Sequence, residues 1–328
     1  MKPSILVTGA AGCIGSNFCE YLVKNTEYHV IALDDLSGSD ESFFADGCEK
    51  YIRDVGSDLT DIFEKHNVRI VYHMAAIAAE SASPFMRKFY YTSNIVNSAN
   101  VINYCIKYNV DRLVFFSSMA VYGNNETPFV ESQTPAPIDP YGIGKYAVEM
   151  DLHCAKVQHG LKWTIVRPHS VYGPKQNIWD KYRNVLGIWM RQILNNEPIS
   201  IYGEGVQRRA FTYVDDIMLP LLLCGEDEDT LYETFNIGSD LEMTLMEVAQ
   251  VLEQVSDKPI EYKFYPGIHE ASNAYSNHDL AAARLGLRCQ TGIREGLKKM
   301  WEWAKVQTPR DVKKFDFELT NGLYKQFQ

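Results

Sequence analysis

The chain has 328 residues, of which 46% are hydrophobic and 23% are charged, a composition typical of a soluble globular protein rather than a disordered or fibrous one. Its formal net charge of −10 opposes nucleic acid as a partner, because affinity for a polyphosphate comes from clustered lysines and arginines. The longest apolar stretch, residues 217–224, is interrupted by Pro220 and is far shorter than the roughly 20 residues of a membrane span, so no membrane partner is expected.

The seven cysteines are scattered and contain no C-x-x-C pair. This pattern argues against a disulfide framework and against a structural zinc site, so we expect reduced thiols and no metal. The first predicted strand begins within the first few residues, which leaves no room for a secretion signal. We therefore expect a cytoplasmic protein.

Short β-branched runs alternate with longer helical patterns through the first half of the chain. The predicted strands are residues 5–8, 30–33, 70–73, 113–117 and 164–167. The predicted helices between them are residues 16–24, 59–65, 94–108 and 141–158. This alternation predicts an α/β fold built on a doubly wound parallel Rossmann sheet.

After Arg167 the pattern changes, because prolines and glycines divide the chain into shorter elements. Residues 245–256 form a predicted helix that opens with a capping box, Thr244 followed by Glu247. An amphipathic helix is predicted over residues 292–303. We expect a Rossmann domain over residues 1–168 with a later return near 211–240, packed against a smaller mixed α/β substrate lobe formed mainly by residues 169–328.

A glycine-rich turn follows the first predicted strand, where residues 8–15 are Thr-Gly-Ala-Ala-Gly-Cys-Ile-Gly. Glycines let the backbone approach a pyrophosphate, whose charge is favourable at the N-terminus of the helix that follows. Asp34, at the end of the second predicted strand, would accept hydrogen bonds from ribose hydroxyls and repel a 2′-phosphate, which favours NAD over NADP. The neighbouring Asp35 is equally well explained as a solvated loop carboxylate.

Three further residues can carry acid–base chemistry. Tyr141 and Lys145 lie one turn apart at the start of a predicted helix. An ordinary phenol is about 4 kcal/mol too weak an acid for pH 7, and a nearby lysine cation lowers its pKa. Ser118 lies at the carboxyl end of a predicted strand, where open α/β sheets bind ligands. Taken separately, each motif has a structural alternative. Tyr141 and Lys145 can be a pair on the surface, and Ser118 can be a serine that only ends its strand.

The joint order of these motifs, together with His73-Met-Ala-Ala76 and Arg167-Pro168, resembles the extended short-chain dehydrogenase/reductase family in its nucleotide-sugar epimerase branch, similar to UDP-glucose 4-epimerase. The resemblance implies that Tyr141 is the general base and acid, that Lys145 binds the nicotinamide ribose, and that Ser118 polarises the sugar oxygen. It implies NAD as cofactor, held by Gly9, Gly12, Cys13, Ile14, Gly15, Asp34, Asp54, Val55, Ala75, Ala76, Ala78, Asn94, Tyr141, Lys145 and Pro168. The implied substrate contacts are Ser118, Tyr141, Ser170, Asn184 and Arg209, with Arg209 gripping the diphosphate.

The implied reaction inverts C4 of a nucleoside-diphosphate hexose through a transient 4-keto intermediate, and a UDP-sugar is the favoured substrate. Met119 and Ala120 stand where related dehydratases carry an acidic pair, and neither titrates, so dehydration is disfavoured. Two departures from the family, Ala78 for a lysine and Ser170 for an asparagine, leave the sugar and nucleotide open. His269 is a candidate second contact to the diphosphate.

Two alternatives stay open at this point. A 4-ketoreductase acting on a nucleotide keto-sugar would share Ser118, Tyr141 and Lys145, and a non-catalytic dinucleotide-binding protein would need none of them. Residues 172–184 are expected to recognise hexose and base. The family also implies a homodimer formed through the helices at residues 94–108 and 141–158.

Overall fold

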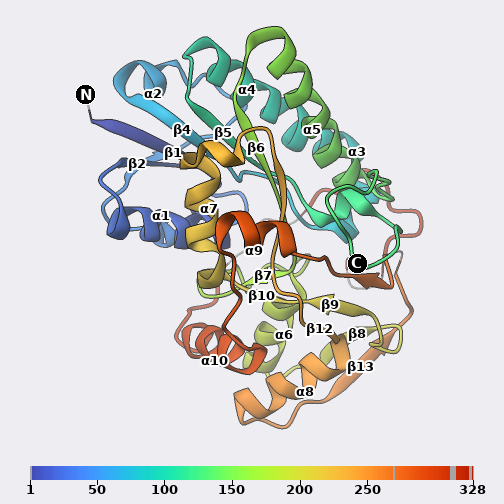
Figure 1. Ribbon diagram of the computed structural model, residues 1–328. Helices are drawn as coiled ribbons and strands as arrows, with labels where there is room; N and C mark the ends of the chain where they lie inside the picture. The colour runs from blue at the N-terminus through green and yellow to red at the C-terminus, as the bar shows by residue number, and fades with distance from the viewer. Residues whose placement is uncertain (1, 269, 311–314, 325–326, 328) are drawn as a thin grey trace.

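The computed structural model describes residues 2–268, 270–310, 315–324 and 327. A parallel seven-stranded sheet occupies its centre (Figure 1). From one edge to the other its strands are β3 (Glu49–Ile52), β2 (His29–Asp34), β1 (Pro3–Thr8), β4 (Asn67–His73), β5 (Arg112–Phe116), β6 (Trp163–Pro168) and β11 (Thr234–Ile237). The strand order reverses between β1 and β4, which opens a crevice at their carboxyl ends. The predicted doubly wound sheet is confirmed.

Helices cover both faces of the sheet (Figure 1). One face carries α1 (Cys13–Asn25) and α7 (Met218–Glu226), and the other carries α2 (Thr60–Lys65), α4 (Asn97–Lys107) and α5 (Pro140–His159). Along β1, Ile5 and Val7 pack into the first of these layers while Leu6 packs into the second. Because successive side chains of a strand point to opposite faces, a strand buried on both sides is a continuous apolar run.

The start of α5 is fixed by local chemistry that can be recognised in the sequence. Asp139 caps the helix, its carboxylate accepting a hydrogen bond of 2.9 Å from the Gly142 amide. Pro140 follows in the first turn, where its missing amide costs nothing. Gly160, with φ of 69°, ends the helix. The helix thus presents Tyr141 and Lys145 from its first two turns.

The segment before α4 is helical over a longer stretch than predicted. It begins with α3 (Arg87–Tyr91) and continues through a π-helical turn, η3 (Thr92–Val96), into α4. Short 3-10 turns join the remaining elements of the chain: η1 (Glu41–Phe43), η2 (Glu80–Phe85), η4 (Met119–Tyr122), η5 (Val214–Ile217) and η6 (Glu228–Thr230). Of these turns, η2 and η4 flank the start of α5.

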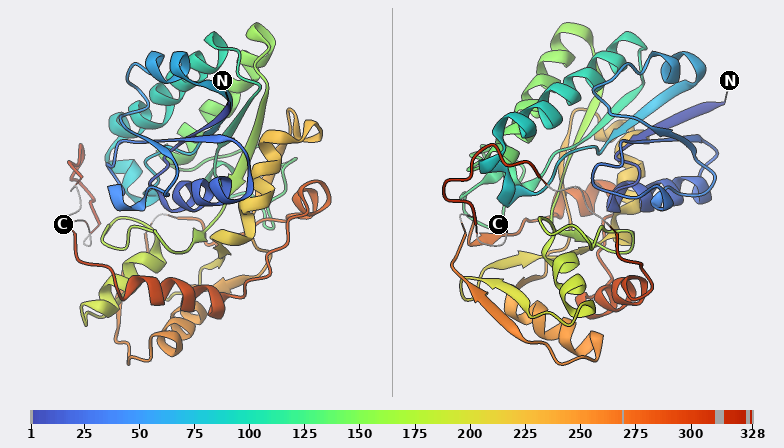
Figure 2. Two further views of the ribbon diagram at one scale, coloured as in Figure 1. Left: turned by 90° about the vertical axis from the view of Figure 1, so that its left-hand side faces the viewer. Right: turned by 180° about the vertical axis from the view of Figure 1, so that it is seen from behind.

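A second group of elements, the small lobe, packs below the carboxyl end of the sheet (Figures 1 and 2). It comprises α6 (Val185–Leu194), β8 (Ile199–Tyr202), β9 (Arg208–Ala210), β12 (Glu242–Thr244), α8 (Leu245–Ser256), β13 (Tyr262–Tyr265), β14 (Asn273–Ala274) and α10 (Ile293–Ala304). Its own core includes the buried Trp189 and Trp301. The predicted capping box of Thr244 and Glu247 is present at the start of α8.

Three short elements lie between the sheet and the small lobe: β7 (Val171–Tyr172), β10 (Thr212–Tyr213) and α9 (Asp279–Leu285). The described residues 315–324, which follow α10 in the sequence, lie on the sheet side beside α3 (Figure 2). There the Glu318 carboxylate accepts hydrogen bonds from the amides of Lys88 and Phe89 at 3.0 and 2.8 Å. In the part of the chain that the structure describes, no helix is long and apolar enough to cross a membrane.

Candidate active site

A cavity of about 370 Å³ lies at the carboxyl ends of β1, β2 and β4. Its volume falls within the range of small-molecule sites. The predicted cofactor contacts that line it are Gly9, Gly12, Cys13, Ile14, Gly15, Asp34, Asp54, Val55, Ala75, Ala76, Ala78, Tyr141, Lys145 and Pro168. The fold therefore collects in one place residues that are far apart in the sequence.

The backbone around the glycine turn leaves no space for side chains at Gly9 and Gly15. A Cβ added to Gly15 would lie 2.2 Å from the Gly9 carbonyl oxygen, and one added to Gly9, whose φ is 70°, would lie 2.8 Å from the Ala75 amide nitrogen. The N-cap of α1 is Gly12, which supplies no side-chain cap. The first amides of α1 thus keep free donors at the positive end of the helix dipole, where a phosphate is stabilised.

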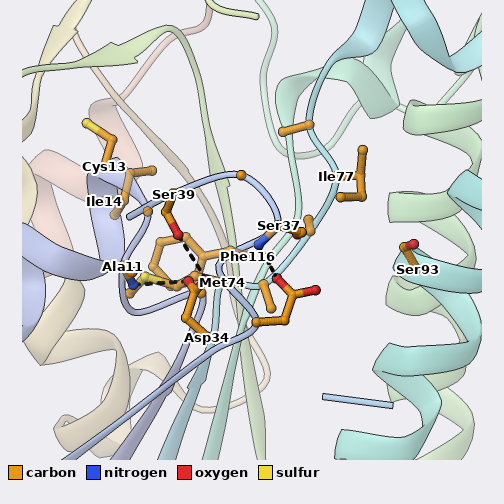
Figure 3. Close-up of a pocket in the computed structure, with 18 of the residues that line it drawn as sticks. Ala11, Cys13, Ile14, Asp34, Ser37, Ser39, Met74, Ile77, Ser93 and Phe116 are labelled. Carbon is orange, nitrogen blue, oxygen red and sulfur yellow. Dashed lines mark hydrogen bonds between the residues drawn. The ribbon is translucent and has the colours of Figure 1, made fainter. Parts of the chain in front are cut away.

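Asp34 lines the cavity next to this turn (Figure 3). Its carboxylate is buried and accepts hydrogen bonds from the Ala11 amide at 3.0 Å, the Leu36 amide at 2.8 Å and the Ser39 hydroxyl at 3.0 Å. Burial raises the pKa of Asp34 despite these bonds. Asp35 also lines the cavity, with its carboxylate bound to the Ser37 amide at 2.9 Å.

Asn94, a predicted cofactor contact, is not among the residues that line the cavity. Its side chain is buried behind the cavity wall, accepting a hydrogen bond from the Ile77 amide at 2.8 Å and donating one to the Ile77 carbonyl at 3.0 Å. Its amide therefore fixes the segment that carries Ala75, Ala76 and Ala78. Asp54 is held in a similar way, accepting from Asn97 at 2.8 Å and from the Gly56 amide at 2.6 Å.

Tyr141 and Lys145 line one end of the cavity, and Ser118, which is not among the lining residues, lies beside Tyr141. The Lys145 ammonium donates to the Phe116 carbonyl at 2.6 Å and lies 6.0 Å from the centroid of the Tyr141 ring. The Ser118 hydroxyl lies within hydrogen-bonding reach of the Tyr141 phenol and also accepts from the Ala120 amide at 3.1 Å. Two elements, α5 and the end of β5, thus bring the three predicted catalytic residues into one cluster.

The electrostatics of this cluster differ from the prediction that Lys145 lowers the pKa of Tyr141. Burial raises the pKa of the phenol well above its usual value, and the hydrogen bond with Ser118 opposes this only in part. Burial also lowers the pKa of Lys145 to about 7, with the Glu149 carboxylate acting in the opposite direction. The amine is therefore only partly charged at neutral pH.

Behind Lys145 lies a buried ion pair that the sequence analysis missed. Arg167 contacts Glu149 through two bonds of 2.9 and 2.6 Å, and the Ser117 hydroxyl donates to the same carboxylate at 2.5 Å. Arg167 also donates to the Tyr122 hydroxyl at 2.8 Å. The position of Glu149 could have been recognised in the sequence, because it lies one helical turn beyond Lys145 on α5.

The predicted substrate contacts are distributed around the cavity rather than gathered in it. Asn184 lines the cavity. Ser170 is not among its lining residues and has a left-handed backbone, with φ of 44°. The Arg209 guanidinium is engaged by Glu270 at 3.0 Å and by the Ala271 carbonyl at 2.8 Å, so a diphosphate would have to compete for it. His269 lies outside the described residues.

The 172–184 segment contributes cavity residues beyond Asn184. Gln176, Asn177 and Arg183 line the cavity, whereas Tyr182 stacks on Phe315 at 4.4 Å between ring centroids. The sequence analysis missed several other lining residues, because none of them belongs to a motif. They include the loop residues Ser37, Gly38, Ser39, Arg53 and Lys175, and the helical residues Phe89, Ser93 and Asn97.

Comparisons with known proteins give a consistent result. The model of the NAD dependent epimerase/dehydratase family matches residues 5–238. A putative UDP-glucose 4-epimerase of Methanocaldococcus jannaschii is 30% identical over 315 residues, covering 92% of this chain and 98% of the relative.

Two solved structures extend the likeness to the fold. UDP-glucose 4-epimerase from Thermotoga maritima, crystallised with UDP-glucose, superposes with a TM-score of 0.86 at 31% identity, covering 92% of this chain and 98% of that one. UDP-glucuronic acid 4-epimerase from Bacillus cereus, in complex with UDP-glucuronic acid and NAD, superposes with a TM-score of 0.84 at 27% identity, covering 92% and 99%.

Proposed function

Since the chain belongs to the NAD dependent epimerase/dehydratase family, we propose that it is a nucleotide-sugar 4-epimerase that inverts C4 of a UDP-hexose. One observation carries the proposal: Tyr141 and Lys145 line the same cavity as the glycine turn, and Ser118 lies within hydrogen-bonding reach of the Tyr141 phenol. A dinucleotide-binding protein without catalysis would need no such cluster.

The residues of the cavity fit NAD. The glycine turn leaves room for a pyrophosphate, which the free amides of α1 would bind. Asp34 and Asp35 offer carboxylates to a ribose and disfavour a 2′-phosphate beside them. When bound, NAD supplies the reversible hydride acceptor that the reaction at C4 requires.

Tyr141 would remove the proton of the sugar 4-hydroxyl and later return it. Its raised pKa means that the phenol holds its proton in the unliganded chain, so a positive charge beside it is needed for it to act as a base. Lys145 supplies that charge when protonated. Ser118 would donate a hydrogen bond to the sugar oxygen at which negative charge develops.

Dehydration is disfavoured by the residues next to Ser118. Met119 and Ala120 begin the turn η4 directly after it, and neither side chain can give or accept a proton. Removal of a second proton from the sugar ring and protonation of a departing hydroxyl would require such groups. Redox at one carbon, followed by return of the hydride to the same sugar, needs only the three residues already described.

The oligomeric state and compartment form part of the same proposal. Ile143, Met150 and Val157 lie seven residues apart on α5, and their side chains are 40%, 49% and 84% exposed. An apolar row with this spacing suits packing against a second helix, which supports a homodimer formed through α4 and α5. All seven cysteines are free thiols, which supports a reducing, cytoplasmic compartment.

The test is incubation of the protein with UDP-, GDP-, CDP- and dTDP-hexoses without added reductant, followed by NMR of the anomeric and C4 protons. We expect a UDP-hexose to be converted to its C4 epimer while the protein-bound cofactor is regenerated. Product formation only when NADH is supplied, with stoichiometric loss of its absorbance, would instead identify a ketoreductase. No conversion of any sugar under either condition would leave only a binding function.

A further inference from the structure

Two histidines and a glutamate meet at the amino ends of β2 and β3, away from the cofactor cavity. His29 is the first residue of β2, Glu49 is the first residue of β3, and His66 directly follows α2. None of the three lines the cavity, which lies at the carboxyl ends of the strands. In the part of the chain that the structure describes, they form the one group of histidine, cysteine or acidic side chains whose ligand atoms are close enough to share a metal ion, all within 4.8 Å of one another.

The topology of the sheet brings these three residues together. β2 and β3 are parallel neighbours at one edge of the sheet, and Ile31 lies opposite Glu49. His29 and Ile31 point to the same face of β2, because alternate residues of a strand share a face. Ile31 packs into the layer that contains α2, and His66 follows α2 on that face. Three elements that are separate in the sequence therefore direct their side chains to one point.

Both imidazoles direct their Nε2 atoms at the carboxylate. Nε2 of His29 lies 3.0 Å from Oε2 of Glu49, and Nε2 of His66 lies 3.3 Å from Oε1 of the same group. Neighbouring ligand atoms around a tetrahedral zinc ion are about 3.4 Å apart, since each lies about 2.0–2.2 Å from the metal. The spacing between each nitrogen and the carboxylate is thus close to that of a zinc site, and a small rotation of the rings would bring the two nitrogens equally close.

The surroundings of the cluster suit an ion that binds nitrogen and oxygen. The Tyr51 hydroxyl lies 2.9 Å from Oε1 of Glu49 and 3.0 Å from Nε2 of His66, so this hydroxyl or a water molecule can complete a four-coordinate shell. The His66 side chain is 8% exposed, whereas those of His29 and Glu49 are 34% and 30% exposed. Packing therefore holds one ligand in place, and the other two leave the cluster open to solvent.

Lys65 competes with a metal ion for the carboxylate. Its ammonium donates to Oε1 of Glu49 at 2.5 Å, and its side chain is 62% exposed. An exposed ion pair of this kind contributes only about 0–1 kcal/mol. A divalent ion that gains three ligands can displace the ammonium, which then returns to water. Removal of Lys65 should therefore strengthen the binding of a metal ion, whereas it would weaken a cluster that only forms ion pairs.

We propose that His29, Glu49 and His66 form a binding site for a divalent transition-metal ion, and that Zn²⁺ suits this set of ligands best. The site is separate from the proposed reaction and does not depend on it. A bound ion would join β2, β3 and the end of α2, and so stabilise the edge of the sheet from which residues 53–55 lead to the cofactor cavity. The expectation of no metal came from the spacing of the cysteines, and this cluster contains no cysteine.

The experiment is isothermal titration calorimetry of the full chain, without an affinity tag, with ZnCl₂ alone. The exposed thiol Cys154 is replaced by serine in every protein titrated, because thiolates also bind Zn²⁺. We expect one site of micromolar affinity, weakened about tenfold or more in His29→Gln and in His66→Gln, since loss of a group that only supports a ligand already costs about 10- to 100-fold. Lys65→Gln should bind about two- to fivefold more tightly. His159→Gln, at an exposed position on α5, is the matched control and should keep the wild-type affinity.

Thermal unfolding gives an independent measurement of the same site. Because a ligand that binds only the folded state stabilises it, Zn²⁺ should raise the Tm of the wild type and should not raise that of His66→Gln. A wild type that shows neither heat of binding nor a change in Tm at submillimolar Zn²⁺ would overturn the proposal, as would an unchanged affinity in His66→Gln. Should the histidine variants fail to fold, as judged by circular dichroism, Lys65→Gln decides: tighter binding supports the site, and equal or weaker binding overturns it.

Discussion

Single residues at the site are constrained to very different degrees. Gly15 has no space for a side chain, because its Cβ position is occupied by a backbone carbonyl. Asp34 is fixed by three hydrogen bonds. Tyr141 is constrained chemically as well as sterically, since its phenol is buried and lies within hydrogen-bonding reach of Ser118. The first constraint concerns binding of the cofactor and the last concerns the reaction.

Replacement of Gly15 by alanine should weaken NAD binding about tenfold or more, because a shift of the turn that costs about 1.4 kcal/mol of binding energy is enough for that. The added Cβ would lie 2.2 Å from the Gly9 carbonyl oxygen, and the backbone would have to move. The NAD content of the purified protein, together with titration of the stripped protein with NAD, measures the effect. Gly267→Ala is the control, since nothing lies within 4 Å of its Cβ position. Wild-type NAD affinity in Gly15→Ala would contradict the assigned turn.

At the scale of elements, much of the fold was predictable. Strands buried on both faces are continuous apolar runs, and α5 and α8 begin with caps that the sequence displays. The edge strand β3 was missed because Glu49, Lys50 and Tyr51 are polar or half-exposed and give no apolar run. The helix α7 was missed because Pro220 interrupts its apolar stretch. Proline is tolerated there, since it lies in the first turn, where amides have no intrahelical partner.

The residues of the candidate site were likewise predicted only in part. Residues that lie in motifs, such as the glycine turn, Tyr141 and Lys145, were predicted and lie together. Glu149 was not predicted, because its role comes from contacts with Ser117 and Arg167, which are distant from it in the sequence. The raised pKa of Tyr141 also could not be foreseen, since burial of a side chain depends on the packing of several elements.

His73, a buried histidine between two strands and a helix, leads to a prediction about how the stability of the fold depends on pH. His73, at the end of β4, bridges the Thr8 and Ser98 hydroxyls at 2.7 and 2.9 Å, and so joins β4 to β1 and α4. Burial, reinforced by Lys145, lowers the His73 pKa to about 3. In the unfolded chain the imidazole takes up a proton near its ordinary value of about 6.5. The stability that the neutral ring contributes is therefore full above pH 6.5 and is lost as the pH falls from about 6.5 towards 3.

The measurement is the free energy of unfolding in urea at pH 7, 6 and 5, for the wild type and for His73→Asn. We expect the wild type to lose about 0.7 kcal/mol more than the variant between pH 7 and 6 and about 1.2 kcal/mol more between pH 6 and 5, because the variant lacks the ring that must be protonated. His159→Asn, at an exposed position near the end of α5, should have the wild-type slope. Equal slopes for His73→Asn and the wild type would show that the ring is not held neutral.

At the scale of the whole molecule, a segment of the chain beyond α10 provides an additional connection between the sheet and the small lobe. The chain beyond α10 returns to α3, where Glu318 binds two helix amides and Phe317 meets Phe85 edge to face at 6.4 Å between ring centroids. Its aromatic residues thus connect the small lobe to the turn η2. The outer face of α5, in contrast, has its apolar row exposed.

Disruption of that row should convert the proposed dimer into a monomer. In the double variant Met150→Glu and Val157→Glu, each copy would have to bury two carboxylates without partners in the interface, which is costly. Light scattering coupled to size-exclusion chromatography gives the mass directly. Leu219→Glu on α7 is the control, since Leu219 is also 50% exposed but lies on the opposite face of the sheet. A wild type that is monomeric at micromolar concentration would contradict the dimer.

The most direct test of the central claim, that the Tyr141 phenol exchanges the proton of the sugar 4-hydroxyl, is the epimerisation rate of Tyr141→Phe measured beside its NAD content. We expect the rate to fall by about 10²- to 10⁴-fold, the usual contribution of a general acid–base group, while NAD remains bound at the wild-type level. Tyr146→Phe, on the same helix but not among the cavity residues, should keep the wild-type rate. Wild-type turnover by Tyr141→Phe, with its cofactor in place, would contradict the account.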